Sequence, residues 1–552
     1  MYSNKENINI LTALLVKFGV KHIVTCPGSR NAPLVHNFSE CPDITCHPVT
    51  DERSAGFIAL GMTQSLMQPV AVCVTSGSAL LNVLPATAEA TYQHSGIIVI
   101  SADRPAAWID QLDGQTLPQP GALGCFVGKC VTLPEPHDDT ERWHCNRLIN
   151  EAMLAYYQPA HPSVHINVPV SEPLFEFSVA KLPDERMVMS ASWSDDRAKD
   201  FFIRKLAEAK RPMFVIGQTQ RYSLPDDYLH ELSQHFVILS EPISGGDLPQ
   251  SFTDQMLYAI EKHPAAYRPD FVMFLGGHTV SKRLRQFLRS LDDKAVQIVV
   301  SPDCELRDIS QHTEYIIVGS MSDVVSDING YLNHRARPSA FYNKWQALRN
   351  DIATRHKAFC PEYSQMLAVK IFEETIGSND DTEVYYANSM SVRLAALYAP
   401  HFCGCNRGLN GIEGSLSVAA GASLTTEENV YCVIGDLSFF YDENALWQQE
   451  LGGNLRIMLL NNGQGGIFRN LRGLDKSPVR DSLVSARHTA TAEGICQQFG
   501  VKYLKATDDK SLQKGIASLC AVKSEHPVLL EVMTDIDIDE KEFKRYYHCL
   551  VN

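Results

Sequence analysis

The sequence lacks any apolar run that approaches the roughly 18 residues of a membrane-spanning helix, so no transmembrane segment is predicted. Residues 1–20 have polar side chains every few positions and no small-residue cleavage site, so no secretory signal is expected. The 15 cysteines are an odd number without paired CxxC spacing, which argues against a disulfide framework or a structural zinc site. These absences predict a reduced, soluble protein of the cytoplasm.

Basic residues are also scarce relative to acidic ones. The chain has 49 Lys and Arg against 64 Asp and Glu, a formal net charge of −15. Such a charge repels a phosphate backbone or an anionic membrane surface. Nucleic acid is therefore not expected as a partner, and small molecules are.

Several catalytic signatures are missing. The chain has no GxxxxGK[ST] phosphate loop, no GxSxG nucleophile elbow and no GxGxxG directly after a strand, which removes the physical core of ordinary kinase, hydrolase and nicotinamide oxidoreductase sites. His230 and His235 are five positions apart, so a zinc-protease helix is not expected. Asp535, Asp537 and Asp539 imitate the start of a calcium loop without its later ligands, and are predicted to form a solvated acidic turn.

What the chain does contain is a repeated α/β pattern. Its 552 residues predict about three or four domains, with 45% hydrophobic and 20% charged residues, as in globular proteins. Short β-branched runs end in small or acidic residues and precede helical segments, which is typical of parallel sheets. We therefore predict three doubly wound α/β domains at residues 1–175, 195–333 and 345–552, with linkers at Ser171–Asp200 and His334–Ser339.

The predicted strands and helices follow the apolar runs. In the first block the strands are His22–Thr25, Val70–Thr75 and Ile97–Ser101, with a helix at Ala79–Gln93 and another at Phe57–Met62. In the second block they are Met213–Gly217, Phe236–Ser240, Phe271–Gly276, Gln297–Ser301 and Tyr315–Gly319, with a helix at Arg283–Leu291. In the third block they are Glu383–Asn388, Val430–Gly435, Leu455–Asn462 and Pro527–Met533, with helices at Ser391–Tyr398 and Glu443–Leu451.

Polar residues follow two strands of the third block. Asp436 comes directly after one strand, and Asn462 comes 26 positions later, at the start of a glycine-rich turn that contains Gln464. The carboxyl ends of neighbouring parallel strands meet at one sheet edge, where open α/β sheets bind ligands. Carboxylate, amide and carbonyl oxygens suit Mg²⁺, and bare backbone amides suit phosphate. Taken alone, Asp436 has an equally good reading as a helix N-cap.

The pair Gly-Asp and Asn-Asn at this spacing resembles the signature of thiamine diphosphate enzymes. The resemblance implies that Asp436, Asn462 and the carbonyl of Gln464 hold the metal, Mg²⁺ or Mn²⁺, that clamps the diphosphate. The family more often has glycine where this chain has Gln464, whose side chain adds crowding. Family members also place a Glu against N1′ of the aminopyrimidine, and Glu52 fits that position as the catalytic residue. In isolation, the residue type and position of Glu52 favour a solvated residue of a first helical turn, and it is the matching motif in the third block that favours the catalytic role.

Further motifs occur in order along the chain: Pro27-Gly28-Ser29-Arg30, Thr75-Ser76-Gly77, Ala102-Asp103-Arg104-Pro105, Gly114-Gln115 with Gln119-Pro120-Gly121, Asn388-Ser389 with Arg393, and Asn406-Arg407-Gly408 with Ile412. Together they resemble the family of 2-succinyl-5-enolpyruvyl-6-hydroxy-3-cyclohexene-1-carboxylate synthases of menaquinone biosynthesis. That resemblance implies decarboxylation of 2-oxoglutarate and conjugate addition of the succinyl carbanion to isochorismate.

The resemblance also assigns the remaining site residues. The cofactor would contact Ser76, Gly77, Ser389, Ile412, Gly435, Leu437, Ser438, Gly465 and Ile467, besides Glu52, Asp436, Asn462 and Gln464. The substrates would contact Ser29, Arg30, Arg104, Gln115, Lys282, Arg283, Ser389, Arg393 and Arg407. Both substrates are dicarboxylates, and an acidic protein that binds them must concentrate cations locally.

Glu52 and Asp436 lie in different blocks, and in related enzymes two subunits share each site, so a homodimer or a dimer of dimers is expected. Two alternatives stay open within and beyond this chemistry. The first is another thiamine diphosphate enzyme, either a 2-oxo acid decarboxylase or a carboligase like acetolactate synthase, whose substrates need fewer cations. The second is a non-catalytic scaffold with the same fold, which predicts loss of Glu52, Asp436 or Asn462, yet all three are present.

Overall fold

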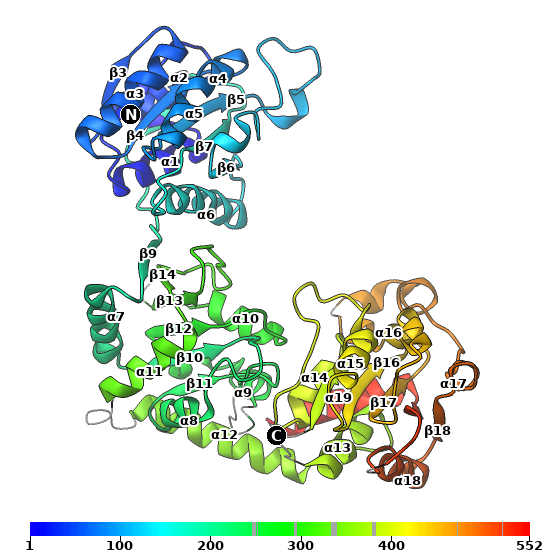
Figure 1. Ribbon diagram of the computed structural model, residues 1–552. Coiled ribbons are helices and arrows are strands. Elements are labelled where there is room, and N and C mark those ends of the chain that lie inside the picture. Colours follow the sequence, from blue (N-terminus) through cyan, green and yellow to red (C-terminus); the bar gives the residue numbers. More distant parts are fainter. Residues whose placement is uncertain are drawn as a thin grey trace. The chain divides into compact units, whose positions relative to one another are not determined.

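The computed structural model describes residues 1–245, 250, 252–291, 295–332, 339–377, 382–471, 473–521 and 523–551. Within it the chain forms two compact units (Figure 1). Unit 1 comprises Met1–Ser192 and Asp303–Val318, and unit 2 comprises Trp193–Pro302 and Gly319–Asn552. Each unit is built from parallel strands with helices packed on them, which confirms the predicted α/β class.

Unit 1 contains a doubly wound sheet and two additional short strand pairs, β1 with β8 and β9 with β14. Its strands are β1 (Tyr2–Ser3), β2 (His22–Thr25), β3 (Thr45–Pro48), β4 (Val70–Val74), β5 (Ile98–Asp103), β6 (Lys129–Thr132), β7 (Val164–Pro169), β8 (Phe177–Val179), β9 (Met189–Ser192) and β14 (Tyr315–Val318). Its helices are α1 (Glu6–Lys17), α2 (Ala32–Glu40), α3 (Glu52–Leu66), α4 (Ser78–Asn82), α5 (Leu84–Tyr92) and α6 (Asp139–Tyr156).

The main sheet of unit 1 has the strand order β3-β2-β4-β5-β7-β6, with every pair parallel. Side chains alternate between its two faces. On β4, Ala71 and Cys73 join a core with α1, α2 and α6, whereas Val70, Val72 and Val74 join a second core with α3, α4 and α5. A sheet covered by helices on both faces explains why its strands read as continuous apolar runs.

Two predicted segments of unit 1 are wrong in detail. The single helix predicted at Ala79–Gln93 is two helices, α4 and α5, which meet at Val83. Pro85 explains the break, because proline has no N–H and its ring clashes with the carbonyl four residues earlier, so α4 cannot continue through it.

The linker predicted at Ser171–Asp200 contains β8, which pairs antiparallel with β1, and β9, which pairs parallel with β14. These strands are too short for periodicity to reveal them.

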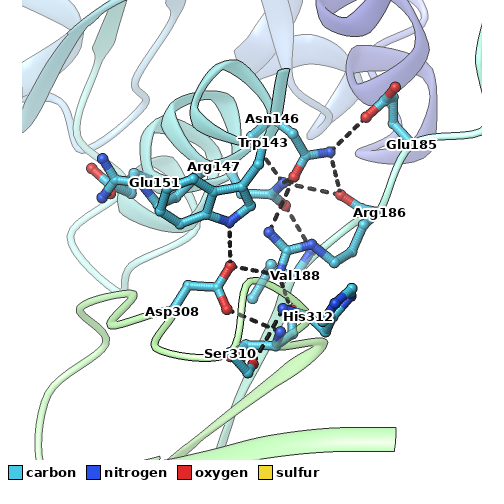
Figure 2. Close-up of polar contacts among 12 residues, drawn as sticks. Trp143, Asn146, Arg147, Glu151, Glu185, Arg186, Val188, Asp308, Ser310 and His312 are labelled. Carbon is cyan, nitrogen blue, oxygen red and sulfur yellow. Dashed lines mark hydrogen bonds and ion pairs between the residues drawn. The ribbon is translucent and has the colours of Figure 1, made fainter. Parts of the chain in front are cut away.

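A buried polar cluster fastens the segment around Asp308 to helix α6 (Figure 2). The Asp308 carboxylate, whose side chain is 0% exposed, forms an ion pair with Arg186 at 2.8 Å. It also accepts hydrogen bonds from Trp143 Nε1 at 2.8 Å and from the backbone N–H of Thr313 at 3.1 Å. Nearby, Leu154, Val188, Leu306 and Ile316 form a small apolar core. The hydrogen bond between Trp143 and Asp308 thereby joins residues that are 165 positions apart in the sequence.

Asp308→Ala is expected to destabilise unit 1 by about 3–5 kcal/mol, because it leaves the Arg186 guanidinium and the Trp143 N–H without their buried acceptor. The matched control is Asp303→Ala, since Asp303 forms an exposed ion pair with Arg307 and should contribute about 0–1 kcal/mol. Urea unfolding followed by circular dichroism measures both. Equal midpoints for the two variants would contradict a stabilising role for this cluster.

Unit 2 contains two parallel sheets. Its strands are β10 (Pro212–Ile216), β11 (Val237–Leu239), β12 (Phe271–Leu275), β13 (Val296–Ser301), β15 (Glu383–Tyr386), β16 (Val430–Gly435), β17 (Leu455–Asn461), β18 (Lys502–Ala506) and β19 (Val528–Met533). Its α-helices are α7 (Asp196–Glu208), α8 (Asp226–His235), α9 (Thr253–Ile260), α10 (Lys282–Arg289), α11 (Met321–Leu332), α12 (Ala340–Ala358), α13 (Gln365–Ile376), α14 (Met390–Tyr398), α15 (Ser415–Ser423), α16 (Asp436–Tyr441), α17 (Glu493–Phe499), α18 (Asp509–Leu519) and α19 (Ile536–Cys549).

One sheet of unit 2 includes the strand order β11-β10-β12-β13, and the other has the order β15-β16-β17-β19-β18. In the second sheet all pairs are parallel, and Gly435 at the end of β16 pairs with Leu460 of β17. That register brings Asp436 and Asn462, which follow these strands, to the same edge. The helix predicted at Glu443–Leu451 is only a short 3₁₀ segment, Glu443–Trp447.

The remaining expectations concern the second linker, the cysteines, metal clusters and membrane-spanning helices. Residues 334–338 of the predicted second linker lie outside the described residues, and Ser339 caps α12. All 15 cysteines are free thiols, as predicted. In the described part of the chain, no group of three or more His, Cys, Asp or Glu could hold a metal ion. None of the described helices combines the length and the apolar character needed to span a bilayer.

Candidate active site

The predicted site residues divide between the two units. In unit 1 they follow the carboxyl ends of parallel strands: Ser29 and Arg30 after β2, Glu52 after β3, Ser76 and Gly77 after β4, and Arg104 after β5. The order of the sheet reverses around β2 and β4, and such a point is where doubly wound sheets bind ligands. The sheet therefore gathers these residues at one edge.

Glu52 opens helix α3. The preceding residue, Asp51, caps the helix by accepting hydrogen bonds from the backbone N–H groups of Arg53 and Ser54. Glu52 is half-buried, and its Oε2 accepts a hydrogen bond of 3.5 Å from Asn82 Nδ2. The carboxyl group thus has a defined position while remaining accessible.

Gln119 is a site residue that the sequence did not assign. It is fully buried, its Oε1 accepts the backbone N–H of Gly77 at 2.7 Å, and its Nε2 donates to Ser101, Ala102 and Asn167. Gly77 has φ of +82°, and a Cβ there would lie 3.1 Å from the backbone of Gln115. Gln115 itself has φ of +57°, which is uncommon for a residue other than glycine. Gln119 therefore orders the turn after β4, which packs against Gln115.

The two predicted arginines of unit 1 differ in how many of their guanidinium nitrogens donate hydrogen bonds to the protein. Arg30 is 6% exposed and donates to the carbonyl of Val170 at 3.0 Å and to Glu172 at 3.2 Å. Arg104 uses its Nε to hold the carbonyl of Gly114 at 3.1 Å. Among the described residues, Nε is the only Arg104 side-chain atom with a hydrogen-bond acceptor, so its terminal nitrogens are better placed than those of Arg30 to bind an anion.

In unit 2, Asp436 organises the turn after β17. Its buried carboxylate accepts the N–H of Leu437 on Oδ1 at 2.7 Å. Its Oδ2 accepts the N–H groups of Asn462, Gly463 and Gln464, at 3.2, 2.8 and 3.2 Å. The same carboxylate lies 3.4 Å from His488 Nε2 and raises the pKa of that imidazole. The spacing of 26 residues between Asp436 and Asn462 thus reflects direct contact.

The side chain of Asn462 forms a hydrogen bond with Asp539. The Asn462 amide donates through Nδ2 to Asp539 Oδ2 at 2.9 Å, and its Oδ1 accepts the N–H of Gln464 at 3.3 Å. The prediction of a solvated acidic turn at Asp535, Asp537 and Asp539 is therefore wrong for Asp539. Asp535 caps α19, and the helical turn that follows points Asp539 inward, where burial raises its pKa to about 6.

The donor set fits a divalent cation with a preference for oxygen ligands. Asp436 and Asn462 each present an oxygen that accepts only one described hydrogen bond, Asp436 Oδ1 and Asn462 Oδ1. Gln464 is 5% exposed, and its side-chain Oε1 is buried without a hydrogen-bond partner in the described structure. A buried carboxylate with neutral amide and carbonyl oxygens is the ligand chemistry that Mg²⁺ and Mn²⁺ prefer.

Gly465, next to the candidate metal ligands, is closely packed. A Cβ on Gly465 would lie 2.7 Å from the ring of Phe468 and 3.3 Å from Leu437, so a larger residue does not fit. Ser438 donates its hydroxyl to the carbonyl of Ile412, which ties the segment that carries Ile412 to α16. Ile412 is 39% exposed, so its side chain is available to contact a ligand. Ile467 is half-buried in the 3₁₀ turn that follows Gly465.

Two predicted site residues lie next to Asn388: Ser389 follows it in the chain, and Arg407 forms a hydrogen bond with its side chain. Ser389, the residue before α14, has φ of +72°, and backbone strain of this kind often marks functional sites. Its carbonyl accepts a hydrogen bond from Arg393. Arg407 donates to Asn388 Oδ1 at 3.1 Å and to the carbonyl of Thr279 at 3.0 Å, while its Nε is buried without a partner among the described groups. Burial lowers the pKa of both arginines.

A cavity of about 430 Å³ in unit 2 is lined by Arg393, Lys282 and Arg283, together with Glu241 and Asp254. Lys282 is exposed, but Arg283 forms an ion pair with Asp254 at 2.6 Å. The Arg283 guanidinium also lies between two tyrosine rings, each 4.9 Å away. Of this basic pair, Lys282 is therefore the residue whose charged group is more accessible to a ligand.

Glu241 is a second residue that sequence reasoning missed. It accepts the backbone N–H groups of Val280 and Ser281, both at 2.6 Å, directly before α10. Burial raises its pKa to about 7, an effect that these hydrogen bonds oppose. It follows β11 in a segment with no recognised motif, so no sequence signal identified it.

Two family models match parts of this chain. Residues 8–121 match the family model described as the thiamine pyrophosphate enzyme, N-terminal TPP binding domain, and residues 388–532 match the corresponding C-terminal TPP binding domain. Thiamine pyrophosphate is another name for thiamine diphosphate. The two matches cover the edges that carry Glu52 and Asp436.

Full-length relatives carry one name. The chain is 41% identical to the 2-succinyl-5-enolpyruvyl-6-hydroxy-3-cyclohexene-1-carboxylate synthase of Bacteroides fragilis, 40% identical to that of Bacteroides thetaiotaomicron and 39% identical to that of Phocaeicola vulgatus. Each alignment covers 100% of both chains. The chain therefore belongs to the family of 2-succinyl-5-enolpyruvyl-6-hydroxy-3-cyclohexene-1-carboxylate synthases, among the enzymes that depend on thiamine pyrophosphate.

Proposed function

We propose that this chain decarboxylates 2-oxoglutarate and adds the resulting succinyl group to isochorismate, as a transferase of menaquinone biosynthesis in the cytoplasm. The single observation that carries the proposal is the identity of about 40% over the whole length to enzymes of that name. The strand-end residues described above supply the groups that such a reaction needs.

Asp436, Asn462 and the Gln464 carbonyl would hold Mg²⁺ or Mn²⁺ at the diphosphate. Gly435, Leu437, Ser438, Gly465 and Ile467 would line the diphosphate, and Ser76, Gly77, Ser389 and Ile412 would contact the rest of the cofactor. When bound, thiamine diphosphate supplies the nucleophilic carbon and the electron sink for decarboxylation. The role of Glu52 is to hold a proton at N1′ of the aminopyrimidine, as the catalytic residue.

The substrate carboxylates would be neutralised by cations at the same edges. Arg393, Arg407 and Lys282 in unit 2 have donors to offer, and Arg104 does in unit 1. Arg283 and Arg30 would also contact the substrates, with the guanidinium donors that their protein partners leave free. Ser29, Gln115 and Ser389 would add polar contacts. A charge-assisted hydrogen bond in such a site is stronger than one in water.

We also propose a domain division at residues 1–175, 195–333 and 345–552, and a homodimer or dimer of dimers with shared sites. Exposed apolar side chains support association. Helix α3 exposes Phe57 and Ile58 shortly after Glu52, and the segment between Arg407 and Ile412 exposes 94% of Leu409. Apolar surface next to a site is typical of an interface.

The direct test follows the disappearance of isochorismate by absorbance. Purified protein is incubated with thiamine diphosphate, Mg²⁺, 2-oxoglutarate and isochorismate, and each component is then omitted in turn. We expect consumption only in the complete mixture, with release of CO₂. Isochorismate loss that continues without 2-oxoglutarate would overturn the proposed reaction, and turnover of pyruvate alone would favour a carboligase or decarboxylase of another kind.

A further inference from the structure

Helix α19 turns one of its acidic residues toward the candidate metal site. Asp535 is the N-cap, and Asp537 is exposed, with 76% of its side chain accessible. Asp539 lies half a turn further and is directed into unit 2. The three acids are alike in sequence spacing and differ only in the direction that the helix gives them.

The acceptor positions of Asp539 are filled by three separate segments. Its Oδ1 accepts the backbone N–H of Gln365 at 2.8 Å, at the start of α13. Its Oδ2 accepts the Thr534 hydroxyl at 2.8 Å, after β19, and Asn462 Nδ2 at 2.9 Å, after β17. The last contact joins residues 77 positions apart.

An ionised carboxylate can only accept hydrogen bonds, so Asn462 must present its NH₂ group to Asp539. Its carbonyl Oδ1 then necessarily faces the other way, toward the N–H of Gln464 and the turn held by Asp436. The Gln464 N–H favours the same orientation, but its contact of 3.3 Å is longer than the 2.9 Å contact with Asp539. Loss of Asp539 would therefore remove the shorter of the two contacts that select the orientation, and a flipped amide would offer a cation a donor instead of an oxygen.

We propose that Asp539 is a positioning residue that fixes the orientation of the Asn462 amide and thereby keeps its Oδ1 available to the divalent cation. The proposal rests on the metal site described under the proposed function. It adds that the ligand geometry depends on the docking of α19, a helix that contributes no ligand of its own.

The test measures Mn²⁺ affinity by electron paramagnetic resonance of free Mn²⁺, at a fixed saturating concentration of thiamine diphosphate. Asp539→Ala should lower the affinity by about 10–100-fold, the usual effect of removing a partner that orients a metal ligand. Asp539→Asn should restore most of it, because its Oδ1 can still accept from Asn462. Asp537→Asn, which removes the same charge from the same helix turn, should bind as the wild type does.

Thermal unfolding without metal separates positioning from stability. A merely structural role predicts that Asp539→Ala lowers the unfolding midpoint while the Mn²⁺ affinity of the folded protein stays unchanged, and that result would overturn the inference. If the alanine variant does not fold, Asp539→Ser, which keeps a small polar group, is measured instead with the same expectation. Failure of the wild type to bind Mn²⁺ would overturn the proposed metal site itself, and this inference with it.

Discussion

Glu52→Gln is expected to lower kcat by about 10²–10⁴-fold, the range in which a positioned proton-transfer group contributes. Glutamine has nearly the same shape and can keep the contact with Asn82, so the fold and the N-terminus of α3 should persist. What it loses is the ability to exchange a proton with the aminopyrimidine. Steady-state kinetics give kcat, and isothermal titration calorimetry with Mg²⁺ gives the cofactor affinity, which we expect to change by less than about tenfold.

Glu89→Gln provides the matched control, because Glu89 is an exposed glutamate on a neighbouring helix, α5. It should leave both kcat and cofactor affinity unchanged. Equal kcat values for Glu52→Gln and the wild type would remove Glu52 from the mechanism, and the alternative of a solvated first-turn residue would then stand.

The same variant also tests whether two chains share each site. Equal amounts of Glu52→Gln and Asp436→Ala chains, mixed under conditions that exchange subunits, should recover about a quarter of wild-type activity if the sites are shared in a symmetric dimer. In half of the dimers one of the two sites then has both residues intact. If each chain forms its own complete site, every site carries one substitution and the mixture stays inactive.

Asp436→Ala is expected to have the second large effect, a loss of more than about 100-fold in divalent metal affinity, since even partners outside the ligand shell contribute 10–100-fold. Two causes act together. The cation loses its charged ligand, and three backbone N–H groups in the turn after β17 lose the carboxylate that holds them. Cofactor affinity, measured by calorimetry while Mg²⁺ is varied, should fall in parallel.

Asp509→Asn is the control for that experiment. Asp509 is also the first residue of a helix in unit 2, α18, but it is exposed and does not belong to the site. Its loss should leave metal affinity within about twofold of the wild type, as for most surface substitutions. Cofactor binding by Asp436→Ala that no longer depends on Mg²⁺, yet remains tight, would contradict the assignment of Asp436 as a ligand.

Local sequence patterns predicted much of the sheet architecture. β2 and β16 have the predicted bounds, and the other predicted strands differ from the structure by one or two residues at their ends. Such runs are recognisable because a strand covered by helices on both faces must be apolar at every position. The break between α4 and α5 at Val83 was missed, although Pro85 was visible, because a proline in the first turn of a second helix resembles one inside a single long helix.

The sequence alone also determined the edge at which the candidate site lies, since each motif directly follows a strand and parallel strands end together. Only the tertiary structure decided which supporting residues act there. Gln119 holds Gly77 across 42 positions, and Asp539 holds Asn462 across 77. Asp537 and Asp539 have the same residue type and similar neighbours in sequence, yet Asp537 is exposed whereas Asp539 is half-buried and accepts a hydrogen bond from Asn462. The physical reason is that a local pattern specifies an element and its ends, whereas the partner of a buried polar group is chosen by the packing of segments that are distant in the chain.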